Sequence, residues 1–183
     1  MIKLILGIGI PGSGKTTILK TFAQKHNYEY ICTDDVRSGL NIASNDSLAA
    51  SDNPVTISMW NAIRERTKEA LKQGKTVVVD ATFTKLELRK EFIDLARENG
   101  AEKVQGVFLD TPSEIAWQQS KQREREVPEH VFRERVKSIT ENPPKVIDGF
   151  DTIFTINEYK NQSKVETENR EKKLSFKSPI KII

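Results

Sequence analysis

The sequence predicts an α/β domain built on a parallel, doubly wound five-stranded sheet with flanking helices. Two observations support this fold class. Five apolar runs alternate along the chain with segments of helical periodicity, which is the order that a parallel sheet with helical crossovers requires. The clearest run, Thr76–Asp80, is β-branched up to its terminal acid, as expected of a strand that is buried on both faces.

The first predicted strand, Ile2–Ile8, is followed by a glycine-rich loop and a helix. The loop reads Gly9-Ile10-Pro11-Gly12-Ser13-Gly14-Lys15-Thr16, and the helical pattern runs from Thr16 to about His26. This order of strand, loop and helix predicts a phosphate-binding P-loop, because the loop has glycines and a Lys-Thr pair at the fixed positions of that motif. A glycine-rich turn that binds no ligand is the alternative.

The residue types of this loop suit a nucleotide triphosphate. Its backbone N–H groups can turn toward an anion at the positive end of the following helix. Lys15 would reach the β- and γ-phosphates, and Thr16 would offer its hydroxyl to Mg²⁺. The expected nucleotide-binding residues are Gly12, Ser13, Gly14, Lys15, Thr16 and Thr17.

The second predicted strand, Tyr28–Thr33, leads into Asp34-Asp35-Val36-Arg37. Cys32 is the only cysteine of the chain, and we expect it to be a buried apolar residue rather than a nucleophile. At a nucleotide site, Asp34 or Asp35 could remove a proton from an acceptor hydroxyl; the alternative is a helix cap with a first-turn acid. Arg37, one turn past Asp34, could bind an acceptor phosphate or form a surface ion pair.

The rest of the chain continues the alternation. Residues 41–53 are small and polar and are interpreted as a loop or a mobile gate. The remaining predicted strands are Thr76–Asp80, Val104–Leu109 and Thr152–Ile156. The remaining predicted helices are 55–73, 86–99, Ser113–Arg125 and Glu129–Ile139, of which the first two are stopped by Gly74 and Gly100.

Ligands of doubly wound sheets bind beyond the carboxyl ends of the strands. The P-loop, Asp34 and Asp80 all follow predicted strands, so we expect them to meet at one edge of the sheet although they are distant in sequence. Asp80 could bind Mg²⁺ through water as the acidic partner of the P-loop, or it could cap the next segment.

A charged segment, Lys121–Pro128, ends one predicted helix. A helical lid can bring an arginine over the phosphates in phosphoryl transfer, and Arg123 or Arg125 could serve in this way. A solvated face of alternating charge is the alternative. We expect three basic residues of the next helix to be ordinary surface residues: Arg133, Arg135 and Lys137.

The net charge of +3 is carried by the end of the chain. Residues 1–156 hold 22 basic and 22 acidic side chains, whereas residues 157–183 hold 7 and 4. A charge-balanced core lacks the basic footprint of a protein that grips long duplex DNA, so any nucleic-acid contact must be local. We expect one domain over 1–156 and a charged tail over 157–183. The tail is expected to be solvated coil or frayed helix. Its excess positive charge could contact nucleic acid.

The chain shows no signal-peptide pattern and no apolar run of about 18 residues. We therefore expect a cytoplasmic protein without a membrane partner. The pattern does not specify an oligomeric state.

Five segments resemble, in this order, the motifs of phage-type polynucleotide 5′-kinase domains and their P-loop relatives. They are Gly-Ile-Pro-Gly-Ser-Gly-Lys-Thr-Thr (9–17), Thr-Asp-Asp-Val-Arg (33–37), Val-Val-Val-Asp-Ala-Thr (77–82), Arg-Glu-Arg-Glu-Val-Pro (123–128) and Asn-Pro-Pro…Asp-Gly-Phe-Asp (142–151). The likeness covers residues 2–156. Two features depart from the family: the core is charge-balanced, and the tail is too short for the phosphatase domain of the bifunctional phage enzymes.

The resemblance implies a P-loop kinase fold with a helical lid, and it implies roles for individual residues. Lys15 and Thr16 would bind ATP·Mg²⁺, Asp34 would be the general base, and Arg37 would hold the phosphate next to the acceptor hydroxyl. Arg123 or Arg125 would act from the lid. Asp80 would lie near the acceptor and the metal, together with Thr82 of the same motif.

These observations predict an ATP-dependent kinase that transfers the γ-phosphate to a 5′-hydroxyl end of DNA or RNA. One alternative is a kinase for a small metabolite or nucleotide-sugar on the same fold, like the gluconate-type and zeta-toxin-like kinases. The other is a P-loop binding module that hydrolyses ATP slowly and serves as a switch.

Overall fold

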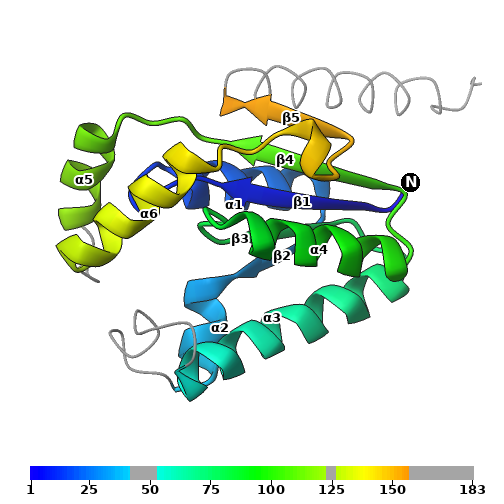
Figure 1. Cartoon of the computed structure of the whole chain (residues 1–183). Coiled ribbons are helices and arrows are strands. Elements are labelled where there is room, and N and C mark those ends of the chain that lie inside the picture. Colours follow the sequence, from blue (N-terminus) through cyan, green and yellow to red (C-terminus); the bar gives the residue numbers. More distant parts are fainter. Residues whose placement is uncertain (42–52, 123–126, 157–183) are drawn as a thin grey trace, which may run out of the picture.

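Five parallel strands form one sheet in the order β2-β3-β1-β4-β5 within the described part of the chain (Figure 1). The computed structural model describes residues 1–41, 53–122 and 127–156. The strands are β1 (Lys3–Ile8), β2 (Glu29–Cys32), β3 (Val77–Asp80), β4 (Lys103–Phe108) and β5 (Thr152–Thr155). The predicted parallel five-stranded α/β fold is confirmed.

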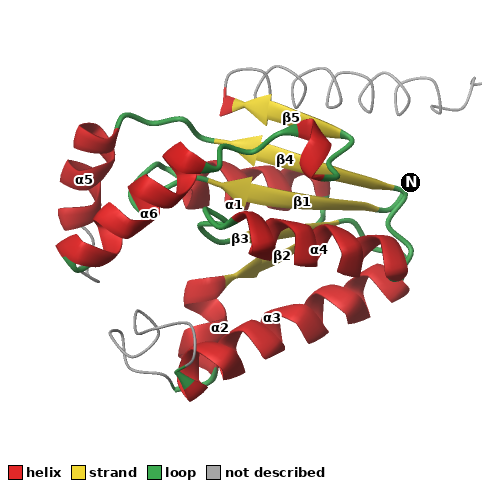
Figure 2. Ribbon diagram, viewed as in Figure 1, coloured by secondary structure: helices red, strands yellow, loops and turns green. Residues whose placement is uncertain are grey.

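Helices connect these strands (Figure 2). They are α1 (Lys15–His26), α2 (Thr33–Gly39), α3 (Pro54–Lys72), α4 (Leu86–Glu98), α5 (Ser113–Lys121), α6 (Glu129–Glu141) and the 3₁₀ turn η2 (Val146–Asp148). The sequence did not predict α2 or η2 as separate elements. The described part of α5 ends at Lys121, and most of the predicted loop at 41–53, residues 123–126 and the tail lie outside the described residues.

Alternate residues of each strand face opposite helical layers. On one face, Leu4 and Leu6 of β1 join a core with Ile63 of α3 and Phe92 of α4. On the other face, Ile5 packs in a second core that includes Leu19 of α1. Both faces are therefore covered, which explains why the strands read as almost continuous apolar runs.

The start of α3 is fixed by local chemistry. The Asn53 side chain accepts a 2.8 Å hydrogen bond from the Val55 N–H, and Pro54 occupies the first helical position. An Asn cap satisfies an otherwise unpaired N–H group, and proline is preorganised for the first turn. The helix therefore begins one residue earlier than the predicted Val55.

The chain changes direction across the sheet at β1, which lies between β3 and β4. After β1, the chain forms β2 and β3 on one side of this strand and then β4 and β5 on the other side. Such a switch point leaves a crevice at the carboxyl ends of the strands. Figure 1 shows these ends pointing toward the side of the molecule on which α5 and α6 lie.

A third apolar cluster joins α5 and α6 to the loop after β1. Ile10 packs there with Ala116 of α5 and with Val131 and Phe132 of α6. The Trp117 and Phe132 rings are 4.8 Å apart between centroids. This packing places the two helices beside the P-loop, as a lid requires. None of the described helices is long and apolar enough to cross a membrane.

Candidate active site

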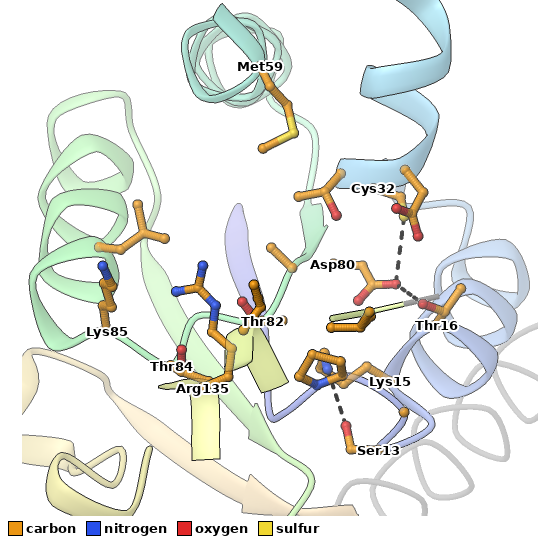
Figure 3. A pocket seen from close by; sticks show the side chains of 18 of the residues that line it. Ser13, Lys15, Thr16, Cys32, Met59, Asp80, Thr82, Thr84, Lys85 and Arg135 are labelled. Carbon is orange, nitrogen blue, oxygen red and sulfur yellow. Dashed lines mark hydrogen bonds between the residues drawn. The ribbon is translucent and has the colours of Figure 1, made fainter. Parts of the chain in front are cut away.

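A cavity of about 790 Å³ opens at the carboxyl ends of the strands, where the switch point predicts a ligand site. Its walls come from the P-loop, α2, α3, the segment between β3 and α4, and α6. Figure 3 shows Ser13, Lys15 and Thr16 on one side of this cavity and Lys85 on the other. Ten predicted site residues line it: Gly12, Ser13, Gly14, Lys15, Thr16, Thr17, Asp34, Arg37, Asp80 and Thr82.

The P-loop backbone requires glycine at two of its positions. Gly12 and Gly14 have φ angles of 78° and 87°, in the left-handed region that side chains disfavour. A Cβ atom on Gly12 would also collide with the carbonyl oxygen of Ala116 in α5. The loop and the lid helix are therefore in direct backbone contact.

Lys15 lies across its own loop and is 7% exposed. Its Nζ donates hydrogen bonds of 2.8 Å to the carbonyl oxygens of Gly9 and Ile10 and one of 3.2 Å to Ser13 Oγ. The ammonium group is thus held inside the curve of the loop, where the phosphates of a nucleotide would lie.

Asp80, at the end of β3, collects three donors on one carboxylate oxygen. Thr16 Oγ1 and Tyr30 OH each donate a 2.7 Å hydrogen bond to Asp80 Oδ2, and Cys32 Sγ lies 3.9 Å from it. Figure 3 shows the contacts of Asp80 with Thr16 and Cys32. The register of the sheet explains this meeting, because Cys32 of β2 and Gly7 of β1 both pair with Asp80. The P-loop and Asp80 thus meet at one edge of the sheet, as the sequence predicted, and the binding of Mg²⁺ by Thr16 and Asp80 stays a prediction.

Tyr30 and Cys32 remain protonated donors in this cluster. Burial and then the Asp80 carboxylate raise the pKa of the Tyr30 hydroxyl. The same two causes, in the same order, raise the pKa of the Cys32 thiol. Cys32 is 5% exposed, so its predicted burial is confirmed.

Asp34 and Arg37 form an ion pair on α2. Arg37 Nη1 lies 2.6 Å from Asp34 Oδ1, and Arg37 Nη2 lies 3.7 Å from the Met59 sulfur. The Arg37 side chain is 8% exposed and the Asp34 side chain 48%. The ion pair of the predicted alternative is present, but it is not a surface pair. Arg37 is enclosed between α2 and α3, while Asp34 reaches the cavity.

Asp35 is exposed, and among the described residues it does not line the cavity. Both acids lie in the first turn of α2, where they suit the helix dipole. The N-cap is Cys32, and no side chain caps this helix, so neither acid is the predicted cap. The geometry separates the pair: Asp34 faces the site and Asp35 faces solvent.

Sequence reasoning missed several residues on the far side of the cavity. Arg135 of α6 was expected on the surface, but it lines the cavity with its guanidinium pointing inward (Figure 3). Arg133 and Lys137 are exposed as expected. Arg135 follows the buried Val131 by four residues and therefore shares its helix face, a signal that the sequence contains. Further missed lining residues are Met59, Trp60, Arg64, Lys85, Leu88 and Glu91.

The two predicted lid arginines, Arg123 and Arg125, lie outside the described residues. The elements on either side of them are in place, because α5 contacts the P-loop and Val127 and Val131 line the cavity. Their role stays a prediction.

The site fits a nucleotide triphosphate with Mg²⁺. The loop combines left-handed glycines, an inward lysine and a helix N-terminus, which are the features that bind phosphates. Among the described residues, no cluster of three or more His, Cys, Asp and Glu side chains could hold a metal. Thr16 and Asp80 together supply only two side chains, so the phosphates would have to provide further oxygen ligands, as is usual for Mg²⁺.

A family profile described as "AAA domain" matches residues 4–142, most of the described fold. The chain belongs to this family. The five-stranded parallel sheet with its P-loop is the fold of P-loop kinases. The predicted fold and family are confirmed.

Individual relatives agree with this assignment. A predicted bifunctional polynucleotide phosphatase/kinase of Acanthamoeba polyphaga mimivirus is 28% identical over 114 residues, which are 62% of this chain and 22% of that protein. A chain of the Pnkp1/Rnl/Hen1 RNA repair complex is similar with a TM-score of 0.65 and 19% identity, over 76% of this chain and 44% of that one. The chain therefore spans less than half of either relative.

A small-molecule kinase shares the same fold. The unliganded sugar kinase of Janibacter sp. HTCC2649 is similar with a TM-score of 0.64 and 19% identity, over 89% of this chain and 90% of that chain. At this identity the likeness concerns the fold alone. The acceptor must therefore be argued from the residues of the site.

Proposed function

We propose that this chain is an ATP-dependent kinase that phosphorylates a 5′-hydroxyl end of DNA or RNA, with its kinase domain in residues 1–156. The observation that carries the proposal is the Asp34–Arg37 pair, which lines the same cavity as the P-loop. A carboxylate can position and deprotonate an acceptor hydroxyl, and a guanidinium beside it can bind a phosphate of the acceptor. The 28% identity to a polynucleotide phosphatase/kinase over 114 residues supports the same acceptor.

The donor side would be served by the P-loop. Its N–H groups and Lys15 would bind the phosphates of ATP, and Thr16 and Asp80 would hold the associated Mg²⁺. ATP supplies the phosphoryl group and Mg²⁺ neutralises its charge. Tyr30 fixes the orientation of Asp80 through its 2.7 Å hydrogen bond, so this carboxylate is preorganised.

The acceptor side would be served by α2. Asp34 would accept the proton of the 5′-hydroxyl while the hydroxyl oxygen forms a bond to the γ-phosphorus of ATP. The bond between the γ-phosphorus and ADP breaks in the same step, and ADP leaves. Arg37 holds one oxygen of Asp34 and so fixes the direction of the carboxylate. Because Arg37 donates from both ends of its guanidinium, it could bridge Asp34 and a phosphate next to the hydroxyl.

A small hydroxylated metabolite is the second candidate acceptor. One part of the far side of the cavity has balanced charges, because Arg64 pairs with Glu91 there. The Glu91 carboxylate would repel a phosphate but would accept hydrogen bonds from hydroxyl groups. This arrangement favours the second candidate more than the slow ATPase, which needs no acceptor cavity.

Transfer of label from γ-labelled ATP tests the proposal. The acceptors are a 5′-hydroxyl oligonucleotide, the same oligonucleotide already phosphorylated at its 5′ end, and gluconate with other polyols. We expect label on the first acceptor alone. Lys15→Ala should reduce transfer by about 10²-fold or more, because it removes a charge that stabilises the transition state. Lys20 is exposed on the same helix, so Lys20→Ala should leave transfer unchanged. Label on a polyol alone would support the metabolite kinase, and hydrolysis insensitive to every acceptor would support the switch.

A further inference from the structure

Arg135 is a cavity-lining cation that the kinase mechanism above does not use. It lies on α6, one turn after Val131, and its side chain is 25% exposed. Figure 3 shows its guanidinium inside the cavity near Thr82, across from Cys32 and the start of α2. It therefore faces the ligand space from the wall opposite the start of α2, the helix that carries Arg37.

The guanidinium of Arg135 makes no hydrogen bond within the described residues. Its only carboxylate neighbour there is Glu134, the preceding residue, at 4.0 Å. The other arginines at the cavity differ, because Arg37 is bonded to Asp34 and Arg64 to Glu91. A guanidinium carries five N–H donors, so a side chain that is three-quarters buried would normally direct some of them to a partner.

Lys85 adds a second cation to this wall. It precedes α4, lines the cavity, and its Nζ lies 3.7 Å from the same Glu134 oxygen that neighbours Arg135. Figure 3 shows Lys85 and Arg135 side by side at this end of the cavity. Two cations share one carboxylate, so this group of three residues has a net positive charge and favours an anion.

We propose that Arg135, with Lys85 beside it, binds a second phosphate of the acceptor strand, on the 3′ side of the phosphate held by Arg37. This inference rests on the proposed function. A planar fork of donors suits the two oxygens of a phosphodiester, and the ammonium of Lys85 adds charge. The enzyme would therefore prefer an acceptor of at least two nucleotides over a single one.

A pair of short acceptors tests this directly. The first is a nucleoside 3′-phosphate, which has one phosphate; the second is a dinucleotide with a 3′-phosphate, which has two. For the wild type we expect the KM of the dinucleotide to be lower by about tenfold or more, the usual gain from a charge-assisted hydrogen bond. In Arg135→Gln the two KM values should converge, with the KM of ATP unchanged. Arg135→Lys should retain part of the KM difference between the two acceptors. Lys85→Gln should lose less of this difference than Arg135→Gln does.

Arg133→Gln is the matched control, because Arg133 lies on the same helix but is 77% exposed and pairs with Glu129. It should keep the wild-type difference between the two acceptors. Thermal unfolding of each variant shows whether it folds. If Arg135→Gln does not fold, the KM values of Arg135→Lys are compared with those of the wild type instead.

Three outcomes would overturn the inference. If wild type and Arg135→Gln prefer the dinucleotide equally, Arg135 binds no second phosphate, while the kinase assignment stands. If Arg135→Gln raises the KM of ATP, or lowers kcat for both acceptors alike, Arg135 acts on the transferred phosphates instead. If the wild type labels no nucleotide but labels a polyol, the proposed function fails and this inference fails with it.

Discussion

Thr16 Oγ1 and Tyr30 OH meet on the same oxygen of Asp80, each at 2.7 Å. The three residues come from α1, β2 and β3, so one carboxylate joins the P-loop helix to two neighbouring strands. When Thr16 turns its hydroxyl oxygen toward a metal, Asp80 keeps the Tyr30 hydrogen bond. Tyr30 is thus a positioning residue for the acid that would hold Mg²⁺.

Removal of that hydroxyl should weaken metal binding without removing any metal ligand. We expect Tyr30→Phe to raise the dissociation constant of Mn²⁺, used in place of Mg²⁺ in the presence of ATP, by about tenfold, as for loss of a hydrogen bond to a charged group. Electron paramagnetic resonance measures the free Mn²⁺. Tyr28→Phe is the control, because the Tyr28 ring stacks on His26, 5.3 Å away, in the second core. An unchanged Mn²⁺ affinity in Tyr30→Phe would show that Asp80 needs no such support.

The acidic pair on α2 offers a comparison of neighbouring residues. Asp34→Asn should reduce kcat by about 10²-fold or more while ATP still binds, because the amide cannot accept the proton. Asp35→Asn should have little effect, since Asp35 is exposed and away from the cavity. Steady-state kinetics with a 5′-hydroxyl oligonucleotide and a separate ATP-binding titration measure both. If the effects were reversed, Asp35 would be the base.

Arg37 should affect the acceptor more than ATP. We expect Arg37→Gln to raise the KM of a nucleoside 3′-phosphate by about tenfold or more and to leave the KM of ATP within about twofold, because the lost contact concerns the acceptor phosphate. A nucleoside without a phosphate should be a poor substrate for the wild type and should show no further loss in the variant. Since Arg37 is buried beside Met59, the variant should also unfold at a lower temperature. Equal wild-type use of nucleoside and oligonucleotide would contradict the assigned role.

Asp151 predicts an acid dependence of stability that is independent of the active site. Its Oδ2 accepts 2.6 Å hydrogen bonds from the Val104 N–H and from Arg97 Nη2, joining the start of β4 to the segment before β5. Burial tends to raise the pKa of this carboxyl, but the Val104 and Arg97 hydrogen bonds outweigh it and hold the pKa below its ordinary value.

A depressed pKa means that the unfolded chain binds the proton more readily than the folded one. The stabilisation by Asp151 is therefore complete above the unfolded pKa of about 3.9 and is lost as the pH falls through the lower folded pKa. Urea unfolding from neutral pH into this acid range should show the wild type losing more stability than Asp151→Asn, and the two should converge at the acid end. Parallel curves would show that the carboxylate contributes nothing.

The sequence by itself determined the local parts of this protein. The order strand, glycine-rich loop, Lys-Thr and helix specified the P-loop, because phosphate binding there uses backbone groups and residues adjacent in the chain. The β-branched run at β3 specified a strand buried on both faces, because that burial leaves no polar positions. Together with the other apolar runs, these patterns were enough to predict a parallel five-stranded sheet and the edge at which the site lies.

Only the tertiary structure decided which residues meet across that edge. The strand order and register bring Tyr30 and Cys32 to Asp80, although no spacing in the sequence relates them. Packing of α2 against α3 buries Arg37 and leaves Asp34 toward the cavity. Residue chemistry alone left Asp34 and Asp35 as alternatives, and only the family resemblance had favoured Asp34. Docking of α6 turns Arg135 inward and leaves Arg133 outside. These are contacts between elements far apart in the chain, and they depend on how the helices pack on the sheet, which local periodicity does not encode.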